Sequence, residues 1–203
     1  MGPNGMAYGA EIGKDIKDTW RPSQESRESY TYFKHTMELN DVLISAMLLH
    51  KADPRFMLDS LRHERYLVKH PQSFVWNGTK FKLIPDAMLK FQTPAGPRTM
   101  LIEHETWSQH QTKFKRKIRK YIAMLQNEAW RAPIAFTTFR GNEHVLHMRQ
   151  WALEELTILH QPPTIGVYFR FTSLEKPLNP ATVWLSARWQ TPYDEAPQTA
   201  LAA

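Results

Sequence analysis

Carboxylates recur at two places in this chain that lie 17 residues apart. Asp86 comes first, and Glu103 and Glu105 then flank His104. Side chains alternate along a strand, so the two glutamates would project to one face of a sheet and His104 to the other. If the two segments pair through the turn at 94–97, three carboxylates converge. Such a cluster is costly unless a cation neutralises it, and Mg²⁺ or Mn²⁺ with oxygen ligands is the natural candidate.

A strongly basic segment follows these acids. Residues 106–140 carry eight bases and one acid, so they account for the whole +6 net charge of the chain. Six of the bases fall within eight residues, namely Lys113, Lys115, Arg116, Lys117, Arg119 and Lys120. The spacing of Phe114, Ile118 and Tyr121 predicts a helix over 110–128 with one apolar face.

Acids beside a basic helix suit metal-dependent cleavage of a phosphodiester. The metal activates water, Lys113 or Lys117 offsets charge in the transition state, and the other bases hold flanking phosphates. We therefore predict that nucleic acid binds the residues Lys113, Lys115, Arg116, Lys117 and Lys120. Two alternatives stay open for this helix, which are a merely solvated face and a surface that docks an acidic protein.

Several short motifs resemble the replication-relaxation family of plasmid and mobile-element proteins, and the similarity covers roughly residues 33–188. The central ones are Pro85-Asp86-Ala87-Met88-Leu89, then Leu101-Ile102-Glu103-His104-Glu105-Thr106, and Lys117 with Tyr121. The outer ones are His35, Thr36, Asn40, Asp41 and Val42, then Leu61-Arg62-His63-Glu64, Tyr168–Ser173 and Val183-Trp184-Leu185.

The resemblance implies a restriction-endonuclease-like core of the PD-(D/E)xK type that acts on DNA in plasmid replication or mobilisation, including nicking of the MobC type. In that interpretation Asp86 and Glu103 are metal ligands. Glu64 is a further ligand or a water-positioning acid, unless it only pairs with a neighbouring arginine. Glu105 stands where the wider superfamily has lysine. The catalytic set is then Asp86, Glu103, Glu105 and Lys117, with Lys113 as the other lysine that could reach the site.

Members of this family commonly carry an N-terminal winged-helix DNA reader. The polar segment 1–32 cannot form one, so sequence-specific addressing is either absent or supplied by a DNA-binding partner protein. The alternative function is a non-catalytic DNA-binding accessory or replication regulator with a degenerate nuclease core. Nothing in the sequence indicates an oligomeric state.

Hydrophobic periodicity predicts an α/β fold with a mixed central sheet flanked by helices. We expect a polar flexible arm over 1–32, the domain over 33–190 and a tail over 191–203. Helices are expected near 35–49, 56–68, 110–128 and 143–159. Strands are expected at 74–76, 81–91 (joined to the previous strand by an Asn-Gly turn), 99–106, 132–139, 164–172 and 181–185.

Composition limits the class of protein. The chain has 203 residues, of which 42% are hydrophobic, and no cysteine. Disulfides, thiolate metal sites and a cysteine nucleophile are therefore excluded. There is no apolar run of about 18 residues that could span a membrane, no basic and apolar leader, and no Walker A motif. We expect a cytoplasmic protein with no membrane partner.

Overall fold

The computed structural model describes residues 30–76, 78–106, 111–127, 131–193 and 199–201. The chain forms two compact units, Met1–Lys34 and His35–Ala203. Most of the predicted arm, residues 1–29, lies outside the described residues. Helix α3 (Tyr30–Met47) begins in the first unit and continues into the second. The fold and the candidate site belong to the second unit.

A mixed five-stranded sheet organises this unit, as the sequence predicts. Its strands are β1 (Met57–His63), β4 (Ala87–Thr93), β5 (Gly96–His104), β6 (Ile134–Thr138) and β7 (Phe169–Ser173), in the order β1-β4-β5-β6-β7. The first three strands run antiparallel, whereas β5, β6 and β7 run parallel. Gly96 closes the β4–β5 turn at φ +102°, a conformation that favours glycine.

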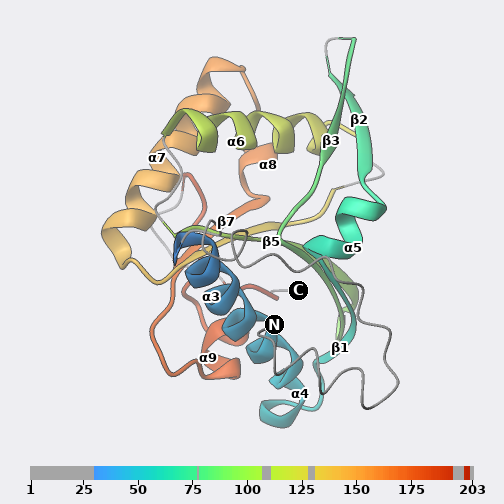
Figure 1. Cartoon of the computed structure of the whole chain (residues 1–203), viewed down its shortest axis with the longest axis vertical. Helices are drawn as coiled ribbons and strands as arrows, with labels where there is room; N and C mark the ends of the chain where they lie inside the picture. Colours follow the sequence, from blue (N-terminus) through green and yellow to red (C-terminus); the bar gives the residue numbers. More distant parts are fainter. Residues whose placement is uncertain (1–29, 77, 107–110, 128–130, 194–198, 202–203) are drawn as a thin grey trace, which may run out of the picture. The chain divides into compact units, whose positions relative to one another are not determined.

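Helices cover both faces of the sheet (Figure 1). On one face lie α6 (Gln111–Leu125) and α7 (Asn142–Ile158), whose apolar side chains share a core with Leu101 and Phe136. On the other face lie α3, α4 (Leu49–Ala52) and α9 (Pro180–Leu185), which share a second core with Ala87 and Ile102. The short α8 (Pro163–Gly166) precedes β7. The α/β class with a mixed sheet is thereby confirmed.

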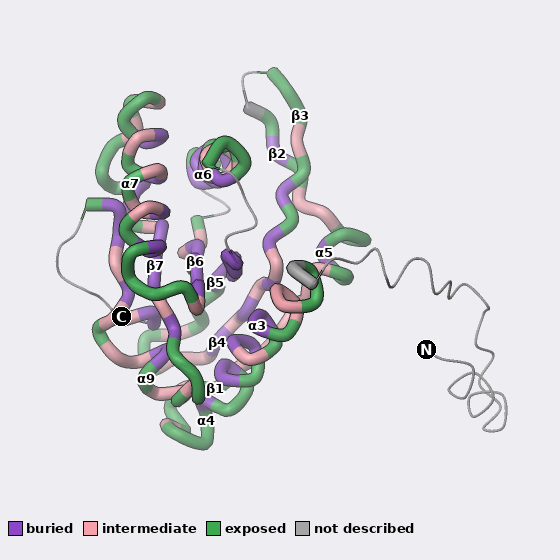
Figure 2. Tube along the Cα trace, turned by 60° about the vertical axis from the view of Figure 1, so that its left-hand side comes forward, coloured by how far each residue is buried: buried purple, intermediate pink, exposed green. Residues whose placement is uncertain are grey.

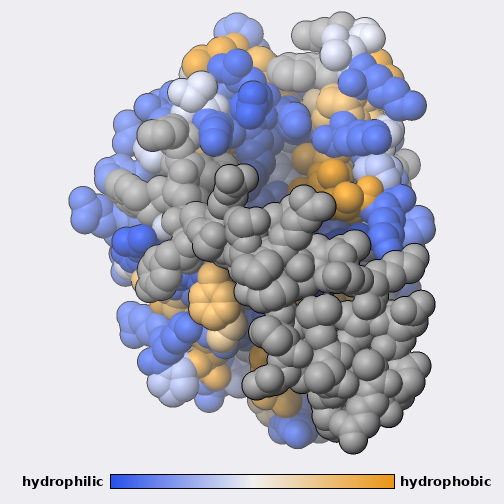
Figure 3. Space-filling view, viewed as in Figure 1, coloured by the Kyte–Doolittle hydropathy of each residue, from blue (hydrophilic) through white to orange (hydrophobic). Residues whose placement is uncertain are grey.

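A β-hairpin stands apart from this sheet. Strands β2 (Gln72–Trp76) and β3 (Thr79–Leu83) pair only with each other. Figure 2 shows the hairpin rising beside α6, and Figure 3 shows both hydrophilic and hydrophobic side chains over it. The predicted hairpin is confirmed, but the predicted continuous strand from 81 to 91 is wrong. The chain leaves one sheet and enters the other at Pro85, which has no N–H for a ladder.

Three elements differ in type from the prediction. In the strand expected over 164–172, residues 164–166 belong to helix α8, and strand β7 begins only at Phe169. The helix expected over 56–68 is strand β1 followed by the short helix α5 (Glu64–Lys69), because residues 57–63 pair with β4. The strand expected over 181–185 is helix α9. There Asn179 accepts a hydrogen bond from the N–H of Thr182, and Pro180 occupies the first turn, both of which are helix-start signals.

The end of the described chain packs on the domain. Gln190 bridges to Phe171 of β7 in antiparallel fashion. Ala200 and Leu201, which fall in the segment predicted as a tail, are buried in the second core. Over the described residues, no helix combines the length and apolarity needed to cross a bilayer.

Candidate active site

Strand register brings the two acidic positions together. Ala87 pairs with Ile102, so one step further along the antiparallel ladder Asp86 lies opposite Glu103. The backbone N–H of His104 donates to Asp86 Oδ2 at 2.7 Å. Asp86 immediately precedes β4, and its position is therefore fixed by the pairing of β4 with β5.

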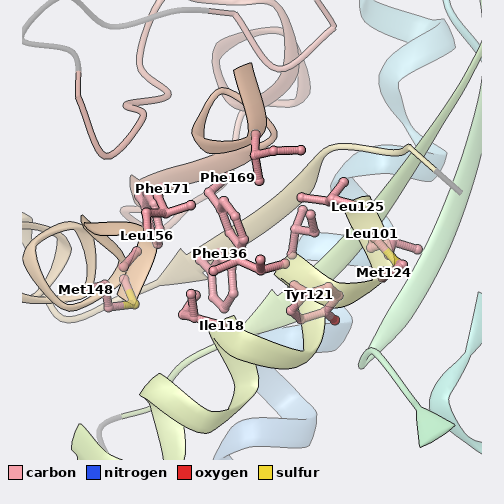
Figure 4. Close-up of a cluster of buried hydrophobic side chains, with 14 of the residues drawn as sticks. Leu101, Ile118, Tyr121, Met124, Leu125, Phe136, Met148, Leu156, Phe169 and Phe171 are labelled. Atoms are coloured by element: carbon pink, nitrogen blue, oxygen red, sulfur yellow. The ribbon is translucent and has the colours of Figure 1, made fainter. Parts of the chain in front are cut away.

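Helix α6 supplies the cation for the two glutamates. Lys117 Nζ donates to Glu103 Oε2 at 2.6 Å and to Glu105 Oε1 at 2.8 Å. One helical turn later, the hydroxyl of Tyr121 donates to Glu103 Oε1. The ring of Tyr121 lies in the first core against Phe136 (Figure 4). Of the two lysines considered from the sequence, Lys117 is the one that reaches the acids.

Burial governs the electrostatics of this cluster. Glu103 and Glu105 are only 2% and 3% exposed. Burial, reinforced by the nearby Asp86 charge, raises the pKa of Glu103 to about 7, although Lys117 and Tyr121 oppose the change. Burial alone would lower the pKa of Lys117, but the surrounding carboxylates raise it above its ordinary value. Lys117 is therefore a fixed cation, while Glu103 gains and loses its proton near neutral pH.

A second polar network holds the site from the opposite face of the sheet. The buried His104 ring is 2.9 Å from Thr137 Oγ1 through Nδ1 and 3.1 Å from Glu38 Oε2 through Nε2. His35 Nε2 lies 3.2 Å from Asp86 Oδ2. Burial raises the pKa of Asp86, but His35 and the other positive groups outweigh it and leave the pKa below its ordinary value.

His35 and Glu38 were missed as site residues by sequence reasoning. They stand three residues apart in α3, a spacing that places two side chains on one helix face. His35 was noted only as part of a family-like motif. His35 contacts a residue 51 positions away in the sequence, and Glu38 contacts one 66 positions away, so spacing alone could not assign their partners.

Glu64 lies elsewhere than its prediction implies. It begins the short helix α5 directly after β1, whereas the sequence predicts one helix over 56–68. Its backbone N–H donates to the carbonyl oxygen of Asp86 at 2.9 Å. Glu64 is thus a neighbour of the site through its main chain.

The bases of α6 divide between two sides of the helix. Lys115 Nζ pairs with Glu154 Oε2 at 2.5 Å, and Arg119 pairs with Glu155, so both face α7. The remaining bases share a different side, beside Lys117. We call Lys113, Arg116 and Lys120 the α6 stripe. Lys115, one of the five residues predicted to bind nucleic acid, is therefore engaged within the fold.

The donor set suits a hard divalent cation. Asp86 and Glu103 offer carboxylate oxygens from neighbouring strands, and Mg²⁺ in enzymes is usually held by one or two carboxylates together with water and substrate phosphate. Within the described part of the chain, no group of three or more His, Asp or Glu side chains is arranged to hold a metal. Two carboxylates plus substrate oxygens are sufficient for Mg²⁺, so the residue types fit the ion, which would replace a contact of Glu103 with Lys117 or Tyr121.

Comparisons with known proteins add no assignment. No protein-family model, curated protein or solved structure matches this chain.

Proposed function

We propose that this chain is a DNA-binding, metal-dependent endonuclease with a restriction-endonuclease-like core, nicking DNA in plasmid replication or mobilisation. One observation carries the proposal. Asp86, which immediately precedes β4, and Glu103 of the adjacent strand β5 share a site with a lysine that comes from the following helix. Two acids and one lysine are the groups that the PD-(D/E)xK pattern requires.

Lys117 takes the place of the motif lysine. Glu105 stands at the motif position, and Lys117 Nζ lies 2.8 Å from its carboxylate. Lys117 would thus bring an ammonium group beside the motif position from a different element. A cation in a water-poor site stabilises the charge that develops on the phosphoryl oxygens far better than one in bulk water.

Asp86 and Glu103 would hold Mg²⁺ or Mn²⁺, with Glu105 beside them. The bound ion supplies a water of lowered pKa and neutralises the scissile phosphate. Asp86 remains ionised because its pKa is below the ordinary value. Sequence addressing would come from a DNA-binding partner protein.

A second candidate is a non-catalytic DNA-binding accessory or replication regulator. It is favoured by the bonds of Lys117 to both Glu103 and Glu105, which neutralise the acids without any metal. A degenerate nuclease core stabilised in this way would keep its basic helix and bind DNA without cutting it.

The two candidates are separated by incubating supercoiled plasmid with Mg²⁺, Mn²⁺ or EDTA. We compare the wild type with Asp86→Asn/Glu103→Gln and with the control Glu143→Gln/Glu175→Gln, which removes two charges from exposed positions. Metal-dependent open circles from the wild type and the control alone support the nuclease. Equal nicking by the site variant refutes this site. Binding without nicking by all three proteins supports the accessory.

A further inference from the structure

The segment between β1 and β4 leaves the main sheet and is basic. It forms α5 and the β2–β3 hairpin. Residues 65–85 contain Arg65, Lys69, Lys80 and Lys82 and no acidic residue. Both ends of the segment adjoin the candidate site, because the Glu64 N–H donates to the carbonyl of Asp86 and Pro85 precedes Asp86. The hairpin is therefore anchored directly on the acidic site.

The two faces of the hairpin differ in character. On the inner face, Phe74 and Phe81 have ring centroids 5.8 Å apart, and Phe74 and Leu83 are buried in the first core with α6. On the outer face, Ser73 pairs with Lys82 and Val75 with Lys80, and all four are exposed. Neither lysine forms an ion pair with a carboxylate of the described residues, so both ammonium groups are open to a ligand.

The hairpin and the α6 stripe are two neighbouring basic elements, and the contacts between α6 and both hairpin strands place them side by side (Figure 2). Figure 3 shows hydrophilic side chains over α6, and both hydrophilic and hydrophobic side chains over the hairpin. The hairpin packs against α6 through the core residues Phe74 and Leu83, which fixes the two basic elements relative to each other.

The chemistry of the outer face fits phosphates better than bases. Lysines give point contacts to backbone phosphates, whereas binding of unpaired bases relies on aromatic platforms. Ser73, Val75, Lys80 and Lys82 offer no such ring. Five residues in each strand extend about 17 Å, enough to cross a major groove about 12 Å wide.

We propose that the β2–β3 hairpin is a second DNA-binding arm, and that Lys80 and Lys82 contact backbone phosphates of duplex DNA beyond the cleavage site. This proposal rests on the proposed function, since it takes DNA as the substrate. It adds a contact surface that is separate from the basic helix. The contacts are independent of sequence, because they reach phosphates only.

Binding of a short fluorescent duplex in EDTA, where no cleavage occurs, tests the arm. We compare wild type with Lys80→Glu/Lys82→Glu and with the control Lys51→Glu/Arg98→Glu. The control makes the same charge change at two exposed positions outside the hairpin and α6. A Lys80→Gln/Lys82→Gln variant replaces the reversal if thermal unfolding shows that the reversal disturbs the fold.

The hairpin variant should bind at least about tenfold more weakly than the control. Its salt dependence between about 50 and 200 mM should be shallower by nearly two, since each lost phosphate contact removes about 0.9 from the slope. Equal affinities of the hairpin variant and the control overturn the arm, as does a loss confined to single-stranded DNA. Plasmid nicking by the wild type is scored separately. Nicking with an inert hairpin refutes the arm alone, and duplex binding through the hairpin without nicking refutes the nuclease alone.

Discussion

Replacing Glu103 by glutamine should stabilise the fold while abolishing cleavage. The pKa of this glutamate is about 7 in the folded chain, against an ordinary value of 4.5. Each pKa unit corresponds to about 1.4 kcal/mol, so ionising the buried carboxyl costs the folded state about 3 kcal/mol. That figure already contains the attraction of Lys117. A glutamine resembles the protonated side chain and avoids the cost.

The pKa of Glu103 is higher in the folded chain than in the unfolded chain, and this direction sets the sign of the pH dependence of stability. The folded chain holds this proton more tightly than the unfolded chain. The resulting stability is fully present below pH 4.5 and is lost as the pH rises to about 7. Glu103→Gln should therefore match the wild type at low pH and exceed its free energy of unfolding by up to about 3 kcal/mol at pH 8.

Urea denaturation of both proteins from pH 5 to pH 8 measures this difference. Taking the difference cancels other titrating groups, such as the histidines near Asp86. If the free energies of unfolding of the two proteins differ by the same amount at every pH, the idea that burial raises the pKa of Glu103 is refuted. It is also refuted if Glu103→Gln is less stable than the wild type at pH 8. A matched Glu175→Gln variant, at an exposed position, should show no pH-dependent gain.

Three further substitutions test the networks around the site. Lys117→Met leaves buried carboxylates without their cation, so urea denaturation at pH 8 should show a loss of about 3 kcal/mol, opposite in sign to Glu103→Gln. Tyr121→Phe removes the hydroxyl that donates to Glu103, which should cost about 1–2 kcal/mol and move the pH-dependent loss of stability to higher pH in the same assay. Glu38→Ala deprives the buried His104 ring of a partner, and calorimetry should report a destabilisation of about 1–3 kcal/mol with duplex binding unchanged.

The hydrophobic pattern of the sequence predicts those helices and strands whose structure is decided by residues close together in the chain. The apolar run before Glu103 and the periodicity around Ile118 predict β5 and α6 correctly. Helix α6 buries one apolar face, whereas β5 is buried on both faces from Met100 to His104. Residues 57–63 were predicted to be helical, since leucines three residues apart also suit a helix. Their pairing with β4 is a tertiary contact that single-sequence propensity does not contain.

The candidate site also contains residues that the sequence alone could bring together and residues that it could not. Asp86 and Glu103 could be brought together from strand order alone, since a short turn joins their strands. From the sequence, either Lys113 or Lys117 could reach the acids. The packing of α6 on the sheet brings Lys117 into contact with Glu103. His35 lies far from Asp86 in sequence and meets it only through the packing of α3.

Binding of Mn²⁺ tests most directly whether the acidic cluster holds a catalytic cation. Electron paramagnetic resonance of free Mn²⁺ gives the bound fraction for wild type, Asp86→Asn and Glu175→Gln, each with a short DNA duplex. We expect Mn²⁺ to bind wild type and Glu175→Gln alike, and Asp86→Asn at least tenfold more weakly, a loss of about 1.4 kcal/mol. Equal binding by all three proteins, or no binding by the wild type with DNA present, would contradict the account.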